Sequence, residues 1–118
     1  MSKRVLIVED DPGLGQTMLE MMELLGFNAK LSSGFRVAKA ILEDDKNWDA
    51  IISDFSLGDG KGSDLMRFCY EDAKMSQTVS IITSGYEREA HLTELDGLDS
   101  VHWIVKPYPI AKLVELIK

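Results

Sequence analysis

Short runs of apolar residues alternate along the chain with longer segments in which apolar residues recur every three or four positions. The runs Val5–Val8, Ala50–Ile52, Val79–Ile82 and Val101–Val105 are rich in Val and Ile and predict strands, and Phe27–Leu31 predicts a weaker strand. Strands that are apolar almost throughout are typical of parallel sheets, because helices cover both faces of such sheets. The pattern therefore predicts a buried parallel sheet.

The segments between these runs predict helices. The first helix begins at Pro12, directly after the candidate N-cap Asp11, and ends at Gly26. Its predicted buried face consists of Leu14, Met18, Met21 and Leu25. A second helix follows the candidate cap Ser33, and a fourth is predicted around Glu89–Leu95. The inward residues of the second, third and last helices are predicted to be Val37, Ile41 and Leu42, then Leu65, Phe68 and Cys69, and finally Ile110, Leu113 and Ile117.

Five predicted strands and five predicted helices alternate strictly along the chain. This order favours an α/β fold in which a parallel sheet carries helices on both faces. A length of 118 residues suits one hydrophobic core and leaves no room for two independent ones. We therefore expect residues 1–118 to form a single domain.

The charge balance is acidic, with 13 Lys and Arg against 20 Asp and Glu, for a net charge of -7. Such a chain repels nucleic-acid phosphates and anionic lipids, so we expect no direct nucleic-acid binding and no membrane association. The apolar stretches are far shorter than the roughly 20 residues that cross a bilayer, and the N-terminus lacks the apolar region of a secretory signal. Cys69 is the only cysteine, which excludes an internal disulfide and favours the reducing cytoplasm.

Polar residues stand directly after four of the predicted strands. Glu9 and Asp10 follow the first, Asp54 follows the third, Thr83 follows the fourth and Lys106 follows the fifth. Ligands of open parallel sheets bind outside the carboxyl ends of the strands, which all meet at one edge. We therefore expect three carboxylates, a hydroxyl and an ammonium group to lie together there.

This set of groups favours phosphoryl chemistry. Three close carboxylates repel one another unless a cation joins them, and oxygen ligands without His or Cys select Mg²⁺ or Mn²⁺. The ammonium and hydroxyl groups suit the remaining sides of a phosphoryl group. A carboxylate beside such a metal can itself attack phosphorus and form an aspartyl phosphate. The residues alone thus indicate a Mg²⁺-dependent phosphoryl acceptor or transferase.

Four short motifs carry a family resemblance. They are Val5-Leu6-Ile7-Val8-Glu9-Asp10-Asp11, Ile51-Ile52-Ser53-Asp54-Phe55-Ser56-Leu57, Ile81-Ile82-Thr83-Ser84-Gly85 and Trp103-Ile104-Val105-Lys106-Pro107. Together, in this order, they make the chain resemble a response regulator receiver domain of two-component signalling, of the chemotaxis-regulator type. The resemblance covers essentially the whole length. It implies a flavodoxin-like (βα)5 three-layer sandwich with a five-stranded parallel sheet of order 2-1-3-4-5.

The resemblance also implies a role for each residue of the predicted site. Asp54 is the implied phosphoacceptor, and Lys106 is implied to pair with the phosphoryl group through a Lys106-Pro107 bond in the cis form. The implied metal ligands are Glu9 (mainly through water), Asp10, Asp54 and the backbone carbonyl of Ser56, with Mg²⁺ as the cofactor and Mn²⁺ as a substitute. Thr83 and Trp103 are the implied switch residues.

The implied function is to accept a phosphoryl group from a phosphohistidine and to signal through the face formed by helix 4, strand 5 and helix 5. The implied partners are a sensor histidine kinase or histidine phosphotransfer protein, and an output domain or target protein outside these residues; phosphorylation-dependent dimerisation is a further expectation. Self-phosphorylation and autodephosphorylation are enzyme-like reactions, although such a domain is not a conventional enzyme.

Other readings of the sequence remain open. A pseudo-receiver that acts only in protein interaction, or the receiver module of a hybrid sensor kinase, would share these motifs. A flavodoxin-like redox module is disfavoured because Glu9-Asp10-Asp11 would repel a flavin phosphate. A haloacid dehalogenase-type phosphatase needs a second Asp two residues after the nucleophile, where this chain has Ser56. Departures from the usual receiver pattern are Gly58 in place of Pro, the segment 94–100 before the last strand, and the bulky Trp103.

Overall fold

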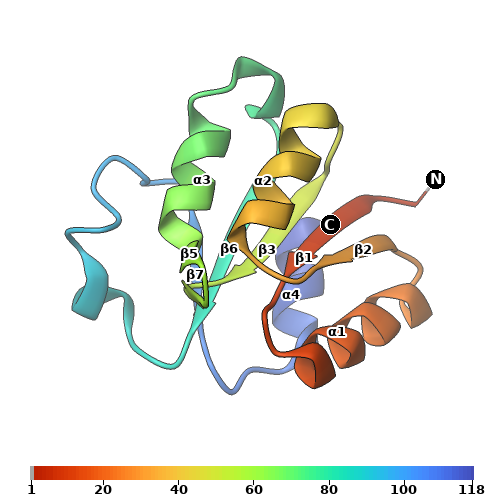
Figure 1. The fold of residues 1–118 in the computed structure, drawn as a ribbon. Coiled ribbons are helices and arrows are strands. Elements are labelled where there is room, and N and C mark those ends of the chain that lie inside the picture. The colour runs from red at the N-terminus through yellow and green to blue at the C-terminus, as the bar shows by residue number, and fades with distance from the viewer. Residues whose placement is uncertain (1) are drawn as a thin grey trace.

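A computed structural model describes residues 2–118 and contains a five-stranded parallel sheet (Figure 1). Its strands lie in the order β2-β1-β3-β6-β7, and a separate antiparallel pair, β4 and β5, follows β3. The bounds are β1 Arg4–Val8, β2 Asn28–Ser32, β3 Ala50–Asp54, β4 Ser56–Leu57, β5 Gly60–Lys61, β6 Val79–Ser84 and β7 His102–Val105. Since β6 and β7 are the fourth and fifth strands of the main sheet, the predicted order 2-1-3-4-5 is confirmed.

Four α-helices cover the sheet: α1 Pro12–Leu24, α2 Phe35–Asp44, α3 Gly62–Tyr70 and α4 Ile110–Ile117. Two short 3-10 helices, η1 Ala73–Met75 and η2 Arg88–His91, complete the regular structure. Helices α2 and α3 pack on one face, and α1 and α4 pack on the other (Figure 1). The predicted three-layer α/β sandwich is therefore confirmed. Within residues 2–118, no helix combines the length and apolar character that a bilayer crossing requires.

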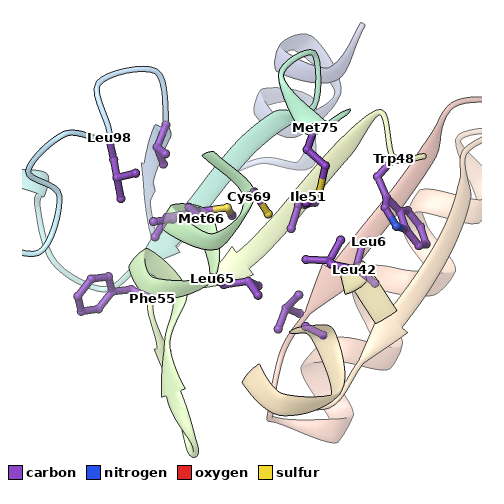
Figure 2. Close-up of a cluster of buried hydrophobic side chains, with 14 of the residues drawn as sticks. Leu6, Leu42, Trp48, Ile51, Phe55, Leu65, Met66, Cys69, Met75 and Leu98 are labelled. Carbon is purple, nitrogen blue, oxygen red and sulfur yellow. The ribbon is translucent and has the colours of Figure 1, made fainter. Parts of the chain in front are cut away.

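Two apolar cores hold the layers together, because successive strand residues point to opposite faces of the sheet. Leu6 and Ile51 point toward α2 and α3, where they meet Leu42, Leu65 and other buried side chains (Figure 2). The opposite core contains Val5, Ile7, Met22, Ile52 and Leu113. Alternation of this kind requires strands that are apolar on both faces, as the sequence has them.

The buried face of α1 differs from the predicted one. Leu14, Met21 and Leu25 are 40%, 37% and 50% exposed, whereas Gly15, Met18 and Met22 are buried. A Cβ atom on Gly15 would lie 3.0 Å from a methyl group of Leu31, so the backbone of α1 approaches β2 closely at this glycine. The helix turns its glycine toward the sheet, and this rotates Leu14 and Met21 outward. A similar rotation in α2 buries Ala38 and leaves Val37 48% exposed.

The helix predicted around Glu89–Leu95 is wrong. The chain forms the single 3-10 turn η2 and then turns until β7. Arg67 of α3 donates hydrogen bonds to the carbonyls of Glu94 and Asp96, and Gly97 turns the chain with a φ of +79°. Leu95 and Leu98 anchor the turns in the core. The fold thus has five parallel strands but only four α-helices within the described residues, and the predicted (βα)5 count is corrected accordingly.

The two predicted N-caps have different outcomes. Asp11 accepts a hydrogen bond from the Leu14 amide at 3.1 Å and caps α1, as predicted. Ser33 does not cap α2, because the N-cap residue is Gly34, which has no side chain to offer. The missing cap of α2 is supplied from a distant part of the chain, as described below.

Candidate functional site

The carboxyl ends of β1 and β3 bring three acids together. Glu9 and Asp10 follow β1, Asp54 ends β3, and one carboxylate oxygen from each lies within 4.8 Å of the others. We call these three residues the acidic site. Adjacent parallel strands with Val8 opposite Ser53 place the ends of β1 and β3 side by side, which is the reason that residues so distant in sequence meet.

Lys106 supplies the positive charge of the site. Its Nζ atom lies 3.0 Å from Asp54 Oδ1 and 3.8 Å from Glu9 Oε1. The Lys106 amide donates to the Ser84 carbonyl at 2.7 Å, which continues the β6–β7 pairing to this residue, and the following bond to Pro107 is cis, as predicted. A single ammonium group therefore faces two carboxylates, and the site keeps an excess of negative charge.

Glu9 is the buried member of the acidic site, with a relative exposure of 4%. Burial raises its pKa above the ordinary value, and the nearby Asp54 carboxylate raises it further. The hydrogen bond from the Asp11 amide, at 3.2 Å, and the Lys106 ammonium act in the opposite direction but do not cancel the effect of burial. Glu9 thus has an electrostatic reason to bind a proton or a metal cation.

The raised pKa of Glu9 predicts a pH dependence of stability in Mg²⁺-free buffer. Because the folded state holds the Glu9 proton more tightly than the unfolded state, this residue favours folding below its ordinary pKa of 4.5, and its contribution is lost as the pH rises through the folded-state value. Urea unfolding between about pH 4 and pH 7 should show this loss for the wild type but not for Glu9→Gln. If the free energy of unfolding changed equally with pH in the two proteins, the prediction would be contradicted.

Thr83 lies beside Asp54 on the neighbouring strand β6, where the two residues are register partners. Its side chain is buried, with a residue exposure of 2%. The Phe55 amide donates to the Thr83 carbonyl at 2.8 Å, so the backbone pairing continues one residue past Asp54. A hydroxyl-bearing residue therefore stands at the same edge as the acidic site.

Trp103 lies farther out, in an aromatic group with Phe55, Tyr86 and His91. The Trp103 indole donates to the Tyr86 carbonyl at 2.9 Å, and its ring centroid lies 5.5 Å from that of Phe55. The His91 ring stacks 4.1 Å from Phe55 and 5.6 Å from Trp103. His91 lies outside the four motifs, and the turns that replace the predicted fourth helix bring its ring close to those of Phe55 and Trp103.

The β4–β5 hairpin, residues 56–61, contacts the acidic site at Asp10. The Gly58 amide donates to Asp10 Oδ2 at 2.9 Å, and Ser56 begins the hairpin two residues after Asp54. At the hairpin tip, Asp59 accepts hydrogen bonds from the Phe35 and Arg36 amides of α2. Gly58 stands out in the sequence only as a departure from the receiver pattern, and Asp59 has no predicted role, although an acid between two glycines is a common turn signal.

Gly62 permits α3 to begin directly against the phosphoacceptor candidate. A Cβ atom on Gly62 would lie 2.5 Å from the Asp54 carbonyl oxygen, and the Gly62 amide donates to the Phe55 carbonyl at 2.7 Å. Real Cβ atoms do not approach backbone oxygen so closely. Any side chain at position 62 must therefore displace the backbone that carries Asp54.

Replacing Gly62 with alanine is expected to lower the free energy of unfolding by about 1–3 kcal/mol, the usual cost of overpacking. Without this close contact, replacing the glycine with alanine would stabilise the protein, because alanine restricts the unfolded chain. Urea unfolding of Gly62→Ala and of Gly85→Ala, where an added Cβ meets no atom within 4 Å, measures the difference. Equal stabilities of the two variants would show that the Asp54 backbone yields without cost.

Cys69 does not contribute to this chemistry. It lies on the buried side of α3 and is 2% exposed, and burial raises the pKa of its thiol to about 12. A thiol that stays protonated at neutral pH is neither a nucleophile nor a metal ligand. The chemistry therefore rests on oxygen ligands and one ammonium group, a set that suits a hard divalent cation and a phosphoryl group.

Comparison with known families decides the identity of the chain. The family described as "Response regulator receiver domain" matches residues 5–118. The chain belongs to this family. Accepting a phosphoryl group is the general function of receiver domains, and the family's acidic pocket binds Mg²⁺. The acidic site described above is the part of the chain that has this composition.

Solved structures resemble the receiver domain over nearly its full length. The chemotaxis response regulator CheY4 of Vibrio cholerae has a TM-score of 0.87 at 18% identity, with 100% of each chain covered. The response regulator TrrA of Thermotoga maritima, solved in complex with Mg²⁺ and BeF, has a TM-score of 0.80 at 19% identity, with 96% of this chain and 94% of that chain covered. At these identities the likeness establishes the fold.

One curated relative adds the context of a longer protein. The swarming motility regulation protein RssB of Serratia marcescens is 26% identical over 97% of this chain. The match covers 51% of RssB, so the receiver domain spans about half the length of this relative.

Proposed function

We propose that Asp54 is the phosphoacceptor of this receiver domain and takes its phosphoryl group from a phosphohistidine on a sensor histidine kinase or a histidine phosphotransfer protein. The observation that carries the proposal is the contact of 3.0 Å between Lys106 Nζ and Asp54 Oδ1, beside two further acids. Among the three acids, Asp54 combines this cation with partial exposure, whereas Glu9 is buried.

The acidic site fits a divalent metal ion. Glu9 (through water), Asp10, Asp54 and the Ser56 carbonyl would hold Mg²⁺, and Mn²⁺ would substitute for it because both ions prefer oxygen ligands. When bound, the ion neutralises charge that develops on the phosphoryl oxygens. The related structure of TrrA with Mg²⁺ and BeF supports this assignment.

The transfer exchanges one bond for another. A carboxylate oxygen of Asp54 forms a bond to phosphorus while the bond between phosphorus and the donor's imidazole nitrogen breaks, and that nitrogen keeps the electron pair. The Lys106 ammonium, already beside Asp54, donates to the transferred phosphoryl oxygens. The phosphoryl group of the product carries a charge of about -1.5 to -2 in place of the single negative charge of the Asp54 carboxylate, and a later attack of water on phosphorus restores that carboxylate.

Phosphorylation by a small donor tests the proposed function. Wild-type protein incubated with phosphoramidate and Mg²⁺ should gain the mass of one phosphoryl group, and EDTA should prevent the gain. A folded wild-type protein that gains no mass at saturating donor and Mg²⁺ would overturn the proposal.

Thr83 and Trp103 are the switch residues of this proposal. The new charge at Asp54 attracts the Thr83 hydroxyl, and the loop after β6 follows, which includes the Tyr86 carbonyl that accepts the Trp103 hydrogen bond. The change then reaches the face formed by η2, β7 and α4, which replaces the helix 4, strand 5 and helix 5 face predicted from sequence. We propose that this face contacts the output domain or target protein and forms any phosphorylation-dependent dimer.

Trp103 fluorescence should report the switch. Beryllium fluoride with Mg²⁺ mimics the phosphoryl group and should shift the Trp103 emission to shorter wavelength, because inward rotation removes the half-buried ring from water. The experiment uses the Trp48→Phe background, since Trp48 is the only other tryptophan. An unchanged spectrum at saturating beryllium fluoride would exclude Trp103 as the switch aromatic.

A further inference from the structure

The β4–β5 hairpin is attached to the N-terminus of α2. Asp59, at its tip, accepts a hydrogen bond from the Phe35 amide at 2.7 Å with one carboxylate oxygen and from the Arg36 amide at 3.0 Å with the other. These amides belong to the first turn of α2, which no side chain of its own caps, because Gly34 stands at the N-cap. Asp59 therefore caps a helix that begins 24 residues earlier in the chain.

The two segments fit at contact distance. A Cβ atom on Gly34 would lie 2.9 Å from Asp59 Oδ1, and one on Gly60 would lie 2.7 Å from the Phe35 ring. Each glycine thus leaves the room that the opposing segment occupies. The two amide hydrogen bonds also lower the pKa of the Asp59 carboxyl, so the contact is a charge-assisted one at neutral pH.

The same hairpin contacts the acidic site at its other end. The Gly58 amide, next to Asp59 in the chain, donates to Asp10 Oδ2 at 2.9 Å, and this bond orients the exposed Asp10 side chain. The hairpin also carries Ser56, whose carbonyl we assigned to the metal. The orientation of Asp10 and the position of the Ser56 carbonyl therefore both depend on this hairpin. The hairpin has only two pairs of opposed residues and is too short to be stable without support.

We propose that Asp59 is a positioning residue for the metal site, which holds the β4–β5 hairpin against α2 and thereby fixes Ser56 and the Gly58–Asp10 hydrogen bond. The inference rests on the proposed function, since it requires that Asp10 and Ser56 take part in metal binding. Asp59 acts through the hairpin backbone and is not itself a ligand. Partners that orient metal ligands in this way affect metal affinity by about 10–100-fold when they are removed.

A purely structural role would make Asp59 only a helix cap. Loss of a cap destabilises a protein without any particular effect on a metal site. The chain permits the two roles to be separated, because Gly34 has an extended backbone that a serine can adopt. In Gly34→Ser/Asp59→Ala, the serine hydroxyl can cap α2 from within the chain, in space that the Asp59 side chain has vacated, while the hairpin stays detached.

The experiment measures the Mg²⁺ dissociation constant by calorimetry and the free energy of unfolding by urea for four proteins. They are the wild type, Asp59→Ala, Gly34→Ser/Asp59→Ala and Asp99→Ala, which removes the same charge from an exposed position outside the hairpin. We expect Asp59→Ala to lose stability and about tenfold in Mg²⁺ affinity. The double variant should regain stability but not Mg²⁺ affinity, and Asp99→Ala should resemble the wild type in both.

The Asp10 side-chain carboxyl resonance, measured without metal, gives a second readout, because Asp10 accepts the Gly58 amide hydrogen bond and is remote in sequence from position 59. The position of this resonance should change in Asp59→Ala and in the double variant but not in Asp99→Ala, because the bond to Asp10 is lost only when the hairpin detaches. Wild-type Mg²⁺ affinity in the double variant would overturn the inference and leave Asp59 as a helix cap. A wild type that binds no Mg²⁺ would instead overturn the metal site of the proposed function, and the inference with it.

Discussion

Replacing Asp54 with asparagine is expected to abolish the mass gain from phosphoramidate and Mg²⁺ while leaving the protein folded. Asparagine has nearly the same shape as aspartate, so the end of β3 should keep its place beside β1 and β6. Its amide oxygen carries no full charge and is a poor nucleophile toward phosphorus. The acidic site also loses one of its three carboxylates and with it part of its attraction for the metal.

Intact-mass spectrometry of Asp54→Asn beside Asp99→Asn measures this effect. Asp99 is exposed and lies outside the acidic site, so its variant should gain one phosphoryl group as the wild type does. A Mg²⁺-dependent gain that persists in Asp54→Asn would identify another acceptor, and the exposed Asp10 would be the first candidate.

Replacing Lys106 with methionine is expected to slow phosphorylation of Asp54 by about 100-fold, the usual order of effect when a preorganised donor is removed from a developing charge. Methionine keeps most of the length of the side chain and removes the ammonium group that lies 3.0 Å from Asp54 Oδ1. Lys106 also acts to lower the pKa of Glu9, so its removal should raise that pKa further.

The same substitution should act on Mg²⁺ binding in the opposite direction. Without the Lys106 ammonium, the acidic site holds more uncompensated negative charge at neutral pH, so Mg²⁺ should bind more tightly. Rates of mass gain and Mg²⁺ titrations of Lys106→Met, compared with Lys112→Met of α4 as a control, separate the two effects. An unchanged phosphorylation rate would contradict a role for Lys106 in transfer.

The placement of the acidic site follows from sequence because parallel strands impose it. Apolar runs mark where β1, β3, β6 and β7 lie, and the residue after each run must then stand at the shared carboxyl edge. Glu9, Asp54 and Lys106 could be assigned in this way without knowledge of any side-chain contact. The local period of the sequence carries this information.

Contacts between distant segments are not encoded in that local period. The outward turn of Met21 depends on how closely the backbone at Gly15 approaches Leu31, and apolar spacing alone does not record that distance. The cap of α2 comes from Asp59 and not from the neighbouring Ser33, since the hairpin folds back on the helix. Arg67 of α3 similarly holds the turns after η2 through the carbonyls of Glu94 and Asp96, a contact that apolar spacing does not record.

The site of phosphorylation itself is the most direct test of the central claim. Borohydride reduces an aspartyl phosphate to homoserine, so protein treated with phosphoramidate and Mg²⁺ can be reduced, digested and sequenced by mass spectrometry. The structure predicts homoserine at position 54 and nowhere else in the chain. Homoserine at another aspartate, with Asp54 intact, would contradict the assignment of Asp54 as phosphoacceptor.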